Sequence, residues 1–212
     1  MMLAWLLNWF SETQLWRWFA RDVIGHFTTR IWGYPSFPMS NFHLIRLAME
    51  RDTSPGVFVF SSCDTRSIAG ILIRWVTGGK FSHSGVLHLD STCGIPALHI
   101  QASGLTHGCF LDVLRQVDVV SVVKYDMTEG NLALASKRMR DILDRGDSIK
   151  YAFPQKLGGN DLYCSELVYL VLEGLAGAHA LQPSNVLGRK AFSPDDAIKY
   201  GRPIFEHKER KA

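Results

Sequence analysis

The chain has 212 residues, of which 47% are hydrophobic and 20% charged, and its formal net charge is +3. This length and composition suit one large domain with a packed core and exclude wholesale disorder. The charge is too small to indicate a nucleic-acid partner. Four cysteines are too few for a disulfide framework in a chain this long, so we expect reduced thiols, as in a cytosol.

The N-terminal 32 residues are rich in tryptophan. They contain Trp5, Trp9, Trp16, Trp18 and Trp32. Ser11 and Gln14 match a capping box, which predicts a helix from about Ser11. This segment could pack on the domain, dock a partner or lie on a membrane surface, and its few basic residues favour packing or docking. A Pro-rich link at 34–38 follows, so we predict a Trp-rich helical extension over 1–40 and one domain over 41–212.

The opening MMLAWLLNWF is apolar but lacks the basic region and the cleavage site of a secretory signal. No stretch reaches the roughly 20 apolar residues that a membrane-spanning helix needs. We therefore expect synthesis in the cytoplasm without a signal peptide. Delivery to a periplasm or a target cell would then use a non-classical route.

Strand and helix patterns alternate through the rest of the chain. The predicted strands are 57–60, 81–89, 97–102 and 117–125. Residues 61–66 are predicted as a loop, and 68–76 as a helix that Gly78 and Gly79 end. A second helix runs through Leu132 and Leu143 until Gly146 stops it, and a short one starts at the Ser-Pro-Asp-Asp run 193–196.

The strand 97–102 carries a polar stripe. A period of two puts His99, Gln101 and Ser103 on one face, and Leu98 and Ile100 on the other. Such a stripe could line the wall of a cleft or face solvent.

A single thiol, Cys164, stands at the start of an apolar run with helical period. The run comprises Leu167, Val168, Val171, Leu172 and Leu175. Unpaired backbone N–H groups and the helix dipole favour thiolate there, although a lone cysteine often acts as a small buried hydrophobe. A nucleophile also needs a base and a group that orients the base. His83 on one strand and Gln101 on its neighbour suit these roles, but eight histidines leave other bases open.

Three stretches together resemble a known family. They are Gly56-Val57-Phe58, the run from Ile73 to Val86 with its Phe-Ser-His-Ser-Gly segment, and Tyr163-Cys164-Ser165-Glu166-Leu167-Val168. They resemble the circularly permuted papain-like hydrolases of the NlpC type, in the YiiX-like branch, in which the histidine strand precedes the cysteine helix. The resemblance covers about Pro55 to Asp196. It implies an α+β fold, with an antiparallel sheet packed against the helix that bears the nucleophile.

The resemblance also implies site residues, and we expect neither a cofactor nor a metal. Cys164 matches the nucleophile and His83 the general base. Gln101 takes the third position, where the family often has Glu, so we expect orientation of the imidazole to persist with lower basicity. Tyr163 and Ser165 flank the thiol and are candidate substrate-binding residues or ordinary helix-start residues.

Three functions follow as hypotheses. The first is a cysteine amidase or endopeptidase that cleaves peptidoglycan stem peptides. The second is a hydrolase or acyltransferase acting on lipid esters or acyl amides, assisted by a membrane-facing N-terminus. The third is a catalytically degenerate or metal-bound interaction domain. Its candidate zinc ligands are His83, His88, Cys93, His99, His107 and Cys109, although no CxxC or HxxxH spacing is present.

Overall fold

The computed structural model describes residues 39–65, 67–88, 94–101, 103–151, 162–175, 181–186 and 189–207. The tryptophan-rich segment 1–32, the link at 34–38 and Cys93 lie outside the described residues. The predicted helix from Ser11 and the division into 1–40 and 41–212 therefore stay predictions.

A six-stranded sheet forms the centre of the fold, in the order β4-β3-β2-β1-β5-β8, and every neighbouring pair is antiparallel. Its strands are β1 (Gly56–Cys63), β2 (His83–Leu87), β3 (Pro96–Gln101), β4 (Gly104–Cys109), β5 (Val119–Asp126) and β8 (Arg202–His207). A separate two-stranded ribbon joins β6 (Ser184–Val186) to β7 (Arg189–Ala191).

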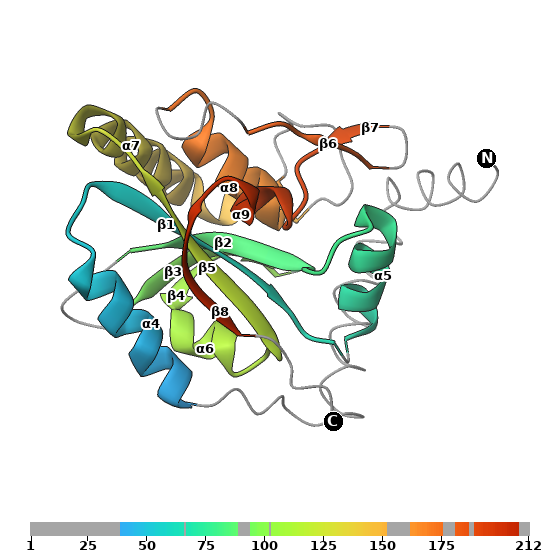
Figure 1. Ribbon diagram of the computed structural model, residues 1–212. Helices are drawn as coiled ribbons and strands as arrows, with labels where there is room; N and C mark the ends of the chain where they lie inside the picture. Colours follow the sequence, from blue (N-terminus) through green and yellow to red (C-terminus); the bar gives the residue numbers. More distant parts are fainter. Residues whose placement is uncertain are drawn as a thin grey trace.

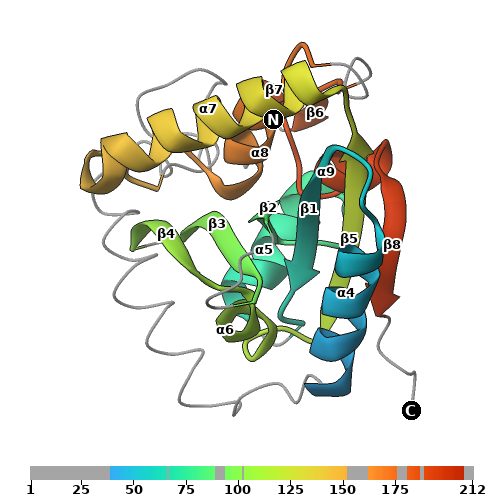
Figure 2. The ribbon, with the colours of Figure 1, turned by 90° about the vertical axis from the view of Figure 1, so that its left-hand side faces the viewer.

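Helices cover both faces of this sheet, as two views at right angles show (Figures 1 and 2). On one side lie α7 (Glu129–Arg145), α8 (Cys164–Leu172) and the short α9 (Asp196–Lys199). On the other lie α4 (Met39–Arg51) and α6 (Phe110–Leu114), while α5 (Ile68–Thr77) leads into β2. A 3-10 turn, Gly146–Ser148, ends α7. The α+β class predicted from the sequence is confirmed.

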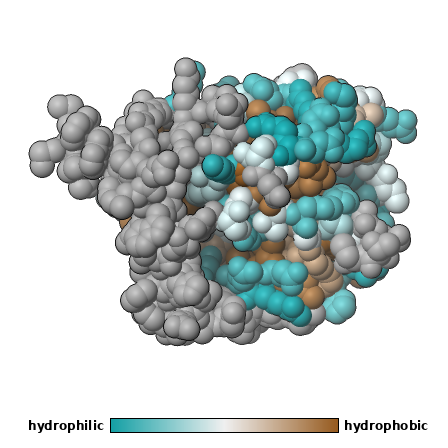
Figure 3. Space-filling model, turned by 180° about the vertical axis from the view of Figure 1, so that it is seen from behind, coloured by the Kyte–Doolittle hydropathy of each residue, from teal (hydrophilic) through white to brown (hydrophobic). Residues whose placement is uncertain are grey.

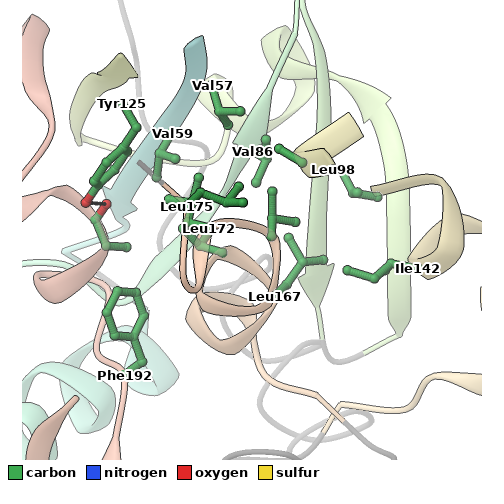
Figure 4. Close-up of a cluster of buried hydrophobic side chains, with 14 of the residues drawn as sticks. Val57, Val59, Val86, Leu98, Tyr125, Ile142, Leu167, Leu172, Leu175 and Phe192 are labelled. Atoms are coloured by element: carbon green, nitrogen blue, oxygen red, sulfur yellow. Dashed lines mark hydrogen bonds between the residues drawn. The ribbon is translucent and has the colours of Figure 1, made fainter. Parts of the chain in front are cut away.

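Strand alternation divides the core into two halves. Val57 and Val59 of β1, together with Val86 of β2, pack with Leu167 and Leu172 of α8 in one buried cluster (Figure 4). The intervening side chains face the other way. They form a second cluster with α4 and α6 that includes Phe58, Phe60, Leu87, Ile45 and Phe110. Each face of the sheet is therefore buried under its own helices.

Local signals set the helix ends: the glycines that end α5 and α7 were predicted, whereas their N-cap residues were not. The Ser67 hydroxyl accepts the Gly70 N–H at 3.2 Å at the start of α5, and Gly78 ends that helix with φ 67°, in the left-handed region. The Thr128 hydroxyl caps α7 through the Asn131 N–H at 3.3 Å, and Gly146 follows its last residue. The short strand β2 lies inside the predicted 81–89.

The predicted loop at 61–66 is wrong in its first half. Ser61, Ser62 and Cys63 continue β1 and pair with β5, while Ser61 and Ser62 also pair with β2. Small polar residues resemble a loop in sequence, but here neighbours on both sides satisfy their backbone groups. The sequence patterns also did not predict α4, β4, α6 or β8.

A buried lysine of β5 binds the segment between α4 and β1. Lys124 is 1% exposed, and its ammonium donates to the Asp52 carboxylate at 2.7 Å and to the Ser54 hydroxyl at 2.9 Å. Arg202 also binds Asp52, at 2.6 Å. This charge is fully partnered, as a buried charge must be.

None of the helices in the described ranges combines the length and apolar character that a membrane span requires. From behind, the described surface carries hydrophobic residues set between hydrophilic ones (Figure 3).

Candidate active site

Cys164 opens α8, directly after the extended N-cap residue Tyr163. The apolar residues that follow bury this helix against β2 and β3, which brings its N-terminus to the start of β2. The Cys164 side chain is 3% exposed, and its sulfur lies 4.0 Å from the carbonyl oxygen of Ser82. The thiol therefore lies beside the residue that precedes His83.

The two residues that flank the thiol are both buried and both bind Phe192. The Tyr163 hydroxyl accepts the Phe192 N–H at 2.9 Å, and the Ser165 hydroxyl donates to the Phe192 carbonyl at 2.5 Å. These bonds hold the start of α8 to the segment before α9. A substrate-binding role for Tyr163 and Ser165 stays a prediction.

Burial raises the pKa of the Cys164 thiol, and the nearby Ser84 and Ser165 groups offset this rise only in part. Burial, and secondarily Cys164, likewise raise the pKa of the Tyr151 phenol well above its ordinary value. The expectation that the helix start would favour thiolate is therefore not met at rest, because loss of solvation outweighs the hydrogen bonds from Ser84 and Ser165.

His83 opens β2 and binds a neighbour that the sequence did not assign to it. Its Nε2 lies 2.8 Å from Nδ1 of His99, whose side chain is 2% exposed. The amide nitrogen of Gln101 lies 3.4 Å from that same Nδ1. Gln101 thus contacts His99, and His99 is the residue that orients His83. The period-two stripe that joins His99 to Gln101 was the signal available in the sequence.

Strand register places Cys164 and His83 on opposite faces of β2. His83 pairs with Ser62, and its ring lies 5.8 Å from that of Phe60, on the α4 and α6 face. Ser84 alternates with His83 and shares the α8 face with Val86. Within the described residues, the hydrogen bonds of the thiol and of the His83 ring go to Ser82 and His99, so the two groups are not bonded to each other.

Both imidazoles are held neutral. Burial, and secondarily the neighbouring His99, lower the pKa of His83 well below its ordinary value. Burial alone lowers the pKa of His99 to about 4. One neutral ring therefore donates to the other, and Gln101 adds its amide to the shared nitrogen.

The four histidines among the candidate zinc ligands form two pairs. His83 and His99 form one pair, while His88 and His107 stack at 5.6 Å between ring centroids. Across the described part of the chain, no group of three or more His, Cys, Asp or Glu side chains is placed to hold a metal ion.

No protein-family model and no curated protein sequence matches this chain. Its structure is similar to the crystal structure of the metalloprotein yiiX from Escherichia coli O157:H7, described as DUF1105, with 12% sequence identity and a TM-score of 0.58. The match covers 73% of this chain and 98% of that one. The chain therefore has a YiiX-like fold, in agreement with the branch predicted from its sequence.

Proposed function

We propose that this protein is a thiol hydrolase that cleaves an amide bond through an acyl-enzyme on Cys164. The observation that supports this most is the position of the thiol, at the first residue of a buried helix and beside the strand that begins with His83. Backbone N–H groups at a helix start are suited to stabilise the oxyanion of acyl transfer. The YiiX-like fold agrees with the family resemblance of the motifs.

In the proposed reaction the sulfur of Cys164 attacks the amide carbonyl carbon, and its proton passes to His83. His83 then protonates the leaving amine, and water hydrolyses the thioester. His99 and Gln101 act behind His83, through the bond at 2.8 Å and the contact at 3.4 Å. Because the His83 ring lies on the opposite face of β2 from the thiol, it must leave His99 and rotate around the start of that strand before it meets the sulfur.

Peptidoglycan stem peptides are the substrate that we propose first, because the motifs resemble permuted papain-like hydrolases of the NlpC type. Lipid esters or acyl amides are the alternative within the same chemistry. Flotation of the protein with liposomes separates the two, since a hydrolase of wall peptides has no need to bind a bilayer.

A specific observation favours a second function, a catalytically degenerate binding domain. The thiol is buried with a raised pKa, and the candidate base is bonded to His99 on the other face. In such a domain Cys164 would react with iodoacetamide near neutral pH no faster than the buried Cys63 or the partly buried Cys109.

Digestion of muropeptides tests the hydrolase directly. Wild-type protein should release new fragments, and Cys164→Ala should release none. Cys63→Ala is the matched control, because it removes another buried thiol from the neighbouring strand β1. Fragments that persist with Cys164→Ala, or their absence with wild type, would rule out peptidoglycan cleavage by this thiol.

A further inference from the structure

We infer that Asp195 is a positioning residue, whose carboxylate holds the entry of strand β2 at a fixed place relative to Cys164. The inference rests on the proposed function, since it gives the candidate nucleophile a defined partner strand. Nothing in the motif resemblance assigns this role to Asp195. In the sequence, that residue was expected only to favour the start of a short helix.

The carboxylate of Asp195 binds two successive backbone amides more than a hundred residues away. Oδ1 accepts the Lys80 N–H at 3.0 Å, and Oδ2 accepts the Phe81 N–H at 3.2 Å. Hydrogen bonds to an ionised acceptor are roughly twice as strong as neutral ones. Ser82, whose carbonyl lies 4.0 Å from the Cys164 sulfur, and then His83 follow directly. The clamp therefore acts one residue before the thiol contact.

The carboxylate of Asp195 packs directly against Gly79. A Cβ added to Gly79 would overlap Oδ2 of Asp195, so an alanine there must displace the carboxylate from its place. Space, and not a left-handed backbone, is what disfavours a side chain there, because Gly79 does not have a positive φ.

The segment Phe192–Asp196, which we call the brace, also holds the other half of the site. Phe192 binds Tyr163 and Ser165 on either side of the thiol, and the Pro194 carbonyl accepts the Ser61 hydroxyl of β1 at 2.6 Å. One short segment thus contacts the start of α8, strand β1 and the entry of β2.

A reciprocal cap stiffens the brace. The Asp196 carboxylate accepts the Ser193 N–H at 2.9 Å, and the Ser193 hydroxyl accepts the Asp196 N–H at 3.1 Å. Asp196 is 5% exposed and also accepts the Ser184 hydroxyl at 2.8 Å. Asp196 is therefore committed to the brace itself, which leaves Asp195 to bind the β2 entry.

Hydrogen exchange and thiol labelling of the full chain test the inference with Asp195→Ala, Asp195→Asn, Gly79→Ala and the Asp195→Ala/Gly79→Ala double variant. Asp112→Ala is the matched control, because it removes an exposed carboxylate from α6. The readouts are amide exchange at Lys80 and Phe81, and the pH profile of Cys164 alkylation by iodoacetamide, with Cys109 as the internal reference. Turnover is measured on any substrate that the wild type cleaves.

Asp195→Ala should speed exchange at Lys80 and Phe81 by about 10-fold or more, while the amides of central β1 and β5 keep their protection. Alkylation of Cys164 should rise by roughly 3-fold or more and reach its midpoint at lower pH, because the thiol loses part of its burial. Turnover should fall by about 10-fold or more, since the reacting groups are no longer held. Asp195→Asn, which keeps one oxygen acceptor, should lie between Asp195→Ala and wild type.

Gly79→Ala should reproduce these changes with the carboxylate still present, and the double variant should be no worse than Asp195→Ala alone, because both changes break one contact. Wild-type exchange and alkylation in Asp195→Ala would overturn the inference. So would equal acceleration across the whole sheet, since that reports global loosening. If the variants respond as expected but the wild type cleaves nothing, the positioning of the thiol stands and the proposed hydrolase fails.

Discussion

The two faces of strand β2 carry the two halves of the proposed chemistry. On the α8 side, Ser84 faces the thiol of Cys164. On the α4 and α6 side, His83 binds His99 beside the ring of Phe60. His83 and Ser84 are consecutive residues, and they lie on opposite faces because successive side chains of a strand alternate. Both groups are desolvated and both are neutral, but they do not meet.

This difference shows that the order of motifs along a chain does not by itself assemble a catalytic pair. Packing α8 on β2 brings Cys164 to the carbonyl of Ser82, next to His83 in sequence. Which face the imidazole takes is decided by the register of β2 against β1, where Ser62 lies opposite His83.

The largest expected losses of turnover come from removing the proposed nucleophile or its proposed base. Cys164→Ala should lower turnover by roughly three orders of magnitude or more, because it removes the sulfur that forms the acyl-enzyme. His83→Ala should lower turnover by about 10²-fold to 10⁴-fold if the imidazole reaches the thiol during the reaction. Steady-state rates on the cleaved muropeptide measure both. Full activity of His83→Ala would mean that the two faces stay separate in catalysis.

The second prediction concerns charge on the histidine face. This face holds the imidazoles of His83 and His99, which bond to each other. It also holds the ammonium of Lys124, which has Asp52 and Ser54 as partners. Lys124→Met should lower the free energy of unfolding by about 2 kcal/mol, since Asp52 keeps Arg202 but loses the hydrogen bond from a fully buried ammonium. Urea unfolding measures this change.

Lys137→Met is the matched control, because Lys137 pairs with Asp141 on the surface of α7, where both side chains are more than half exposed. Its unfolding free energy should change by less than about 0.5 kcal/mol. Equal effects of the two substitutions would show that Lys124 is not held as described.

Much of this arrangement was predictable, and the exceptions have physical reasons. Hydrophobic period and helix caps predicted β1, β5, α5 and α7, since each signal lies within its own segment. The polar stripe of β3 was predicted too, as alternation is local. The hydrogen-bond partner of His83 was not predicted. Gln101 and His99 lie on the same face of β3, and only the diagonal packing of side chains between β2 and β3 places His99 against His83.

The strands β4 and β8 were missed for another reason. The strand β4 contains two glycines, and β8 contains Pro203 near its start, which are weak strand formers at the sheet edges where both strands lie. The pKa of Cys164 was expected in the wrong direction, because burial of the helix start depends on tertiary contacts that the sequence does not display. Asp195 was likewise interpreted within its own helix, while its partners lie beyond Gly79.

The third prediction uses the neutral imidazoles. Burial lowers the pKa of His99 to about 4 in the folded chain, against about 6.5 when unfolded. Between these values the unfolded chain binds more protons than the folded chain. The contribution of the neutral His99 to the free energy of unfolding is therefore fully present above pH 6.5 and is lost as the pH falls toward 4. We expect His99→Gln to reduce this acid loss by about 2 kcal/mol, measured as the difference between unfolding free energies at pH 7 and pH 4.5.

The exposed His107 supplies the control, since His107→Gln removes an imidazole from β4 without removing a buried one. Its acid loss should exceed that of His99→Gln, because the buried imidazole of His99 is still present. An unchanged acid loss in His99→Gln would show that the paired imidazoles are not the groups that protonate on unfolding.

The smallest expected effect comes from two buried serines, one on each face of the sheet. The hydroxyls of Ser62 and Ser84 are both fully buried, and within the described structure neither oxygen has a hydrogen-bond partner at rest. Ser84 lies on the thiol side, where its groups lower the pKa of Cys164, whereas Ser62 lies on the histidine side. Replacing either by alanine removes an unpaired buried hydroxyl, so the free energy of unfolding should change by less than about 1 kcal/mol.

The two variants should differ only in thiol chemistry. Ser84→Ala should slow alkylation of Cys164 at pH 7 by about 3-fold, because the thiolate loses a donor, and Ser62→Ala should leave the rate unchanged. Mass spectrometry of the labelled chain gives both rates from one time course. Equal slowing in the two variants would mean that the loss reflects general loosening of the sheet, and that the face of β2 on which a hydroxyl lies does not decide its effect on Cys164.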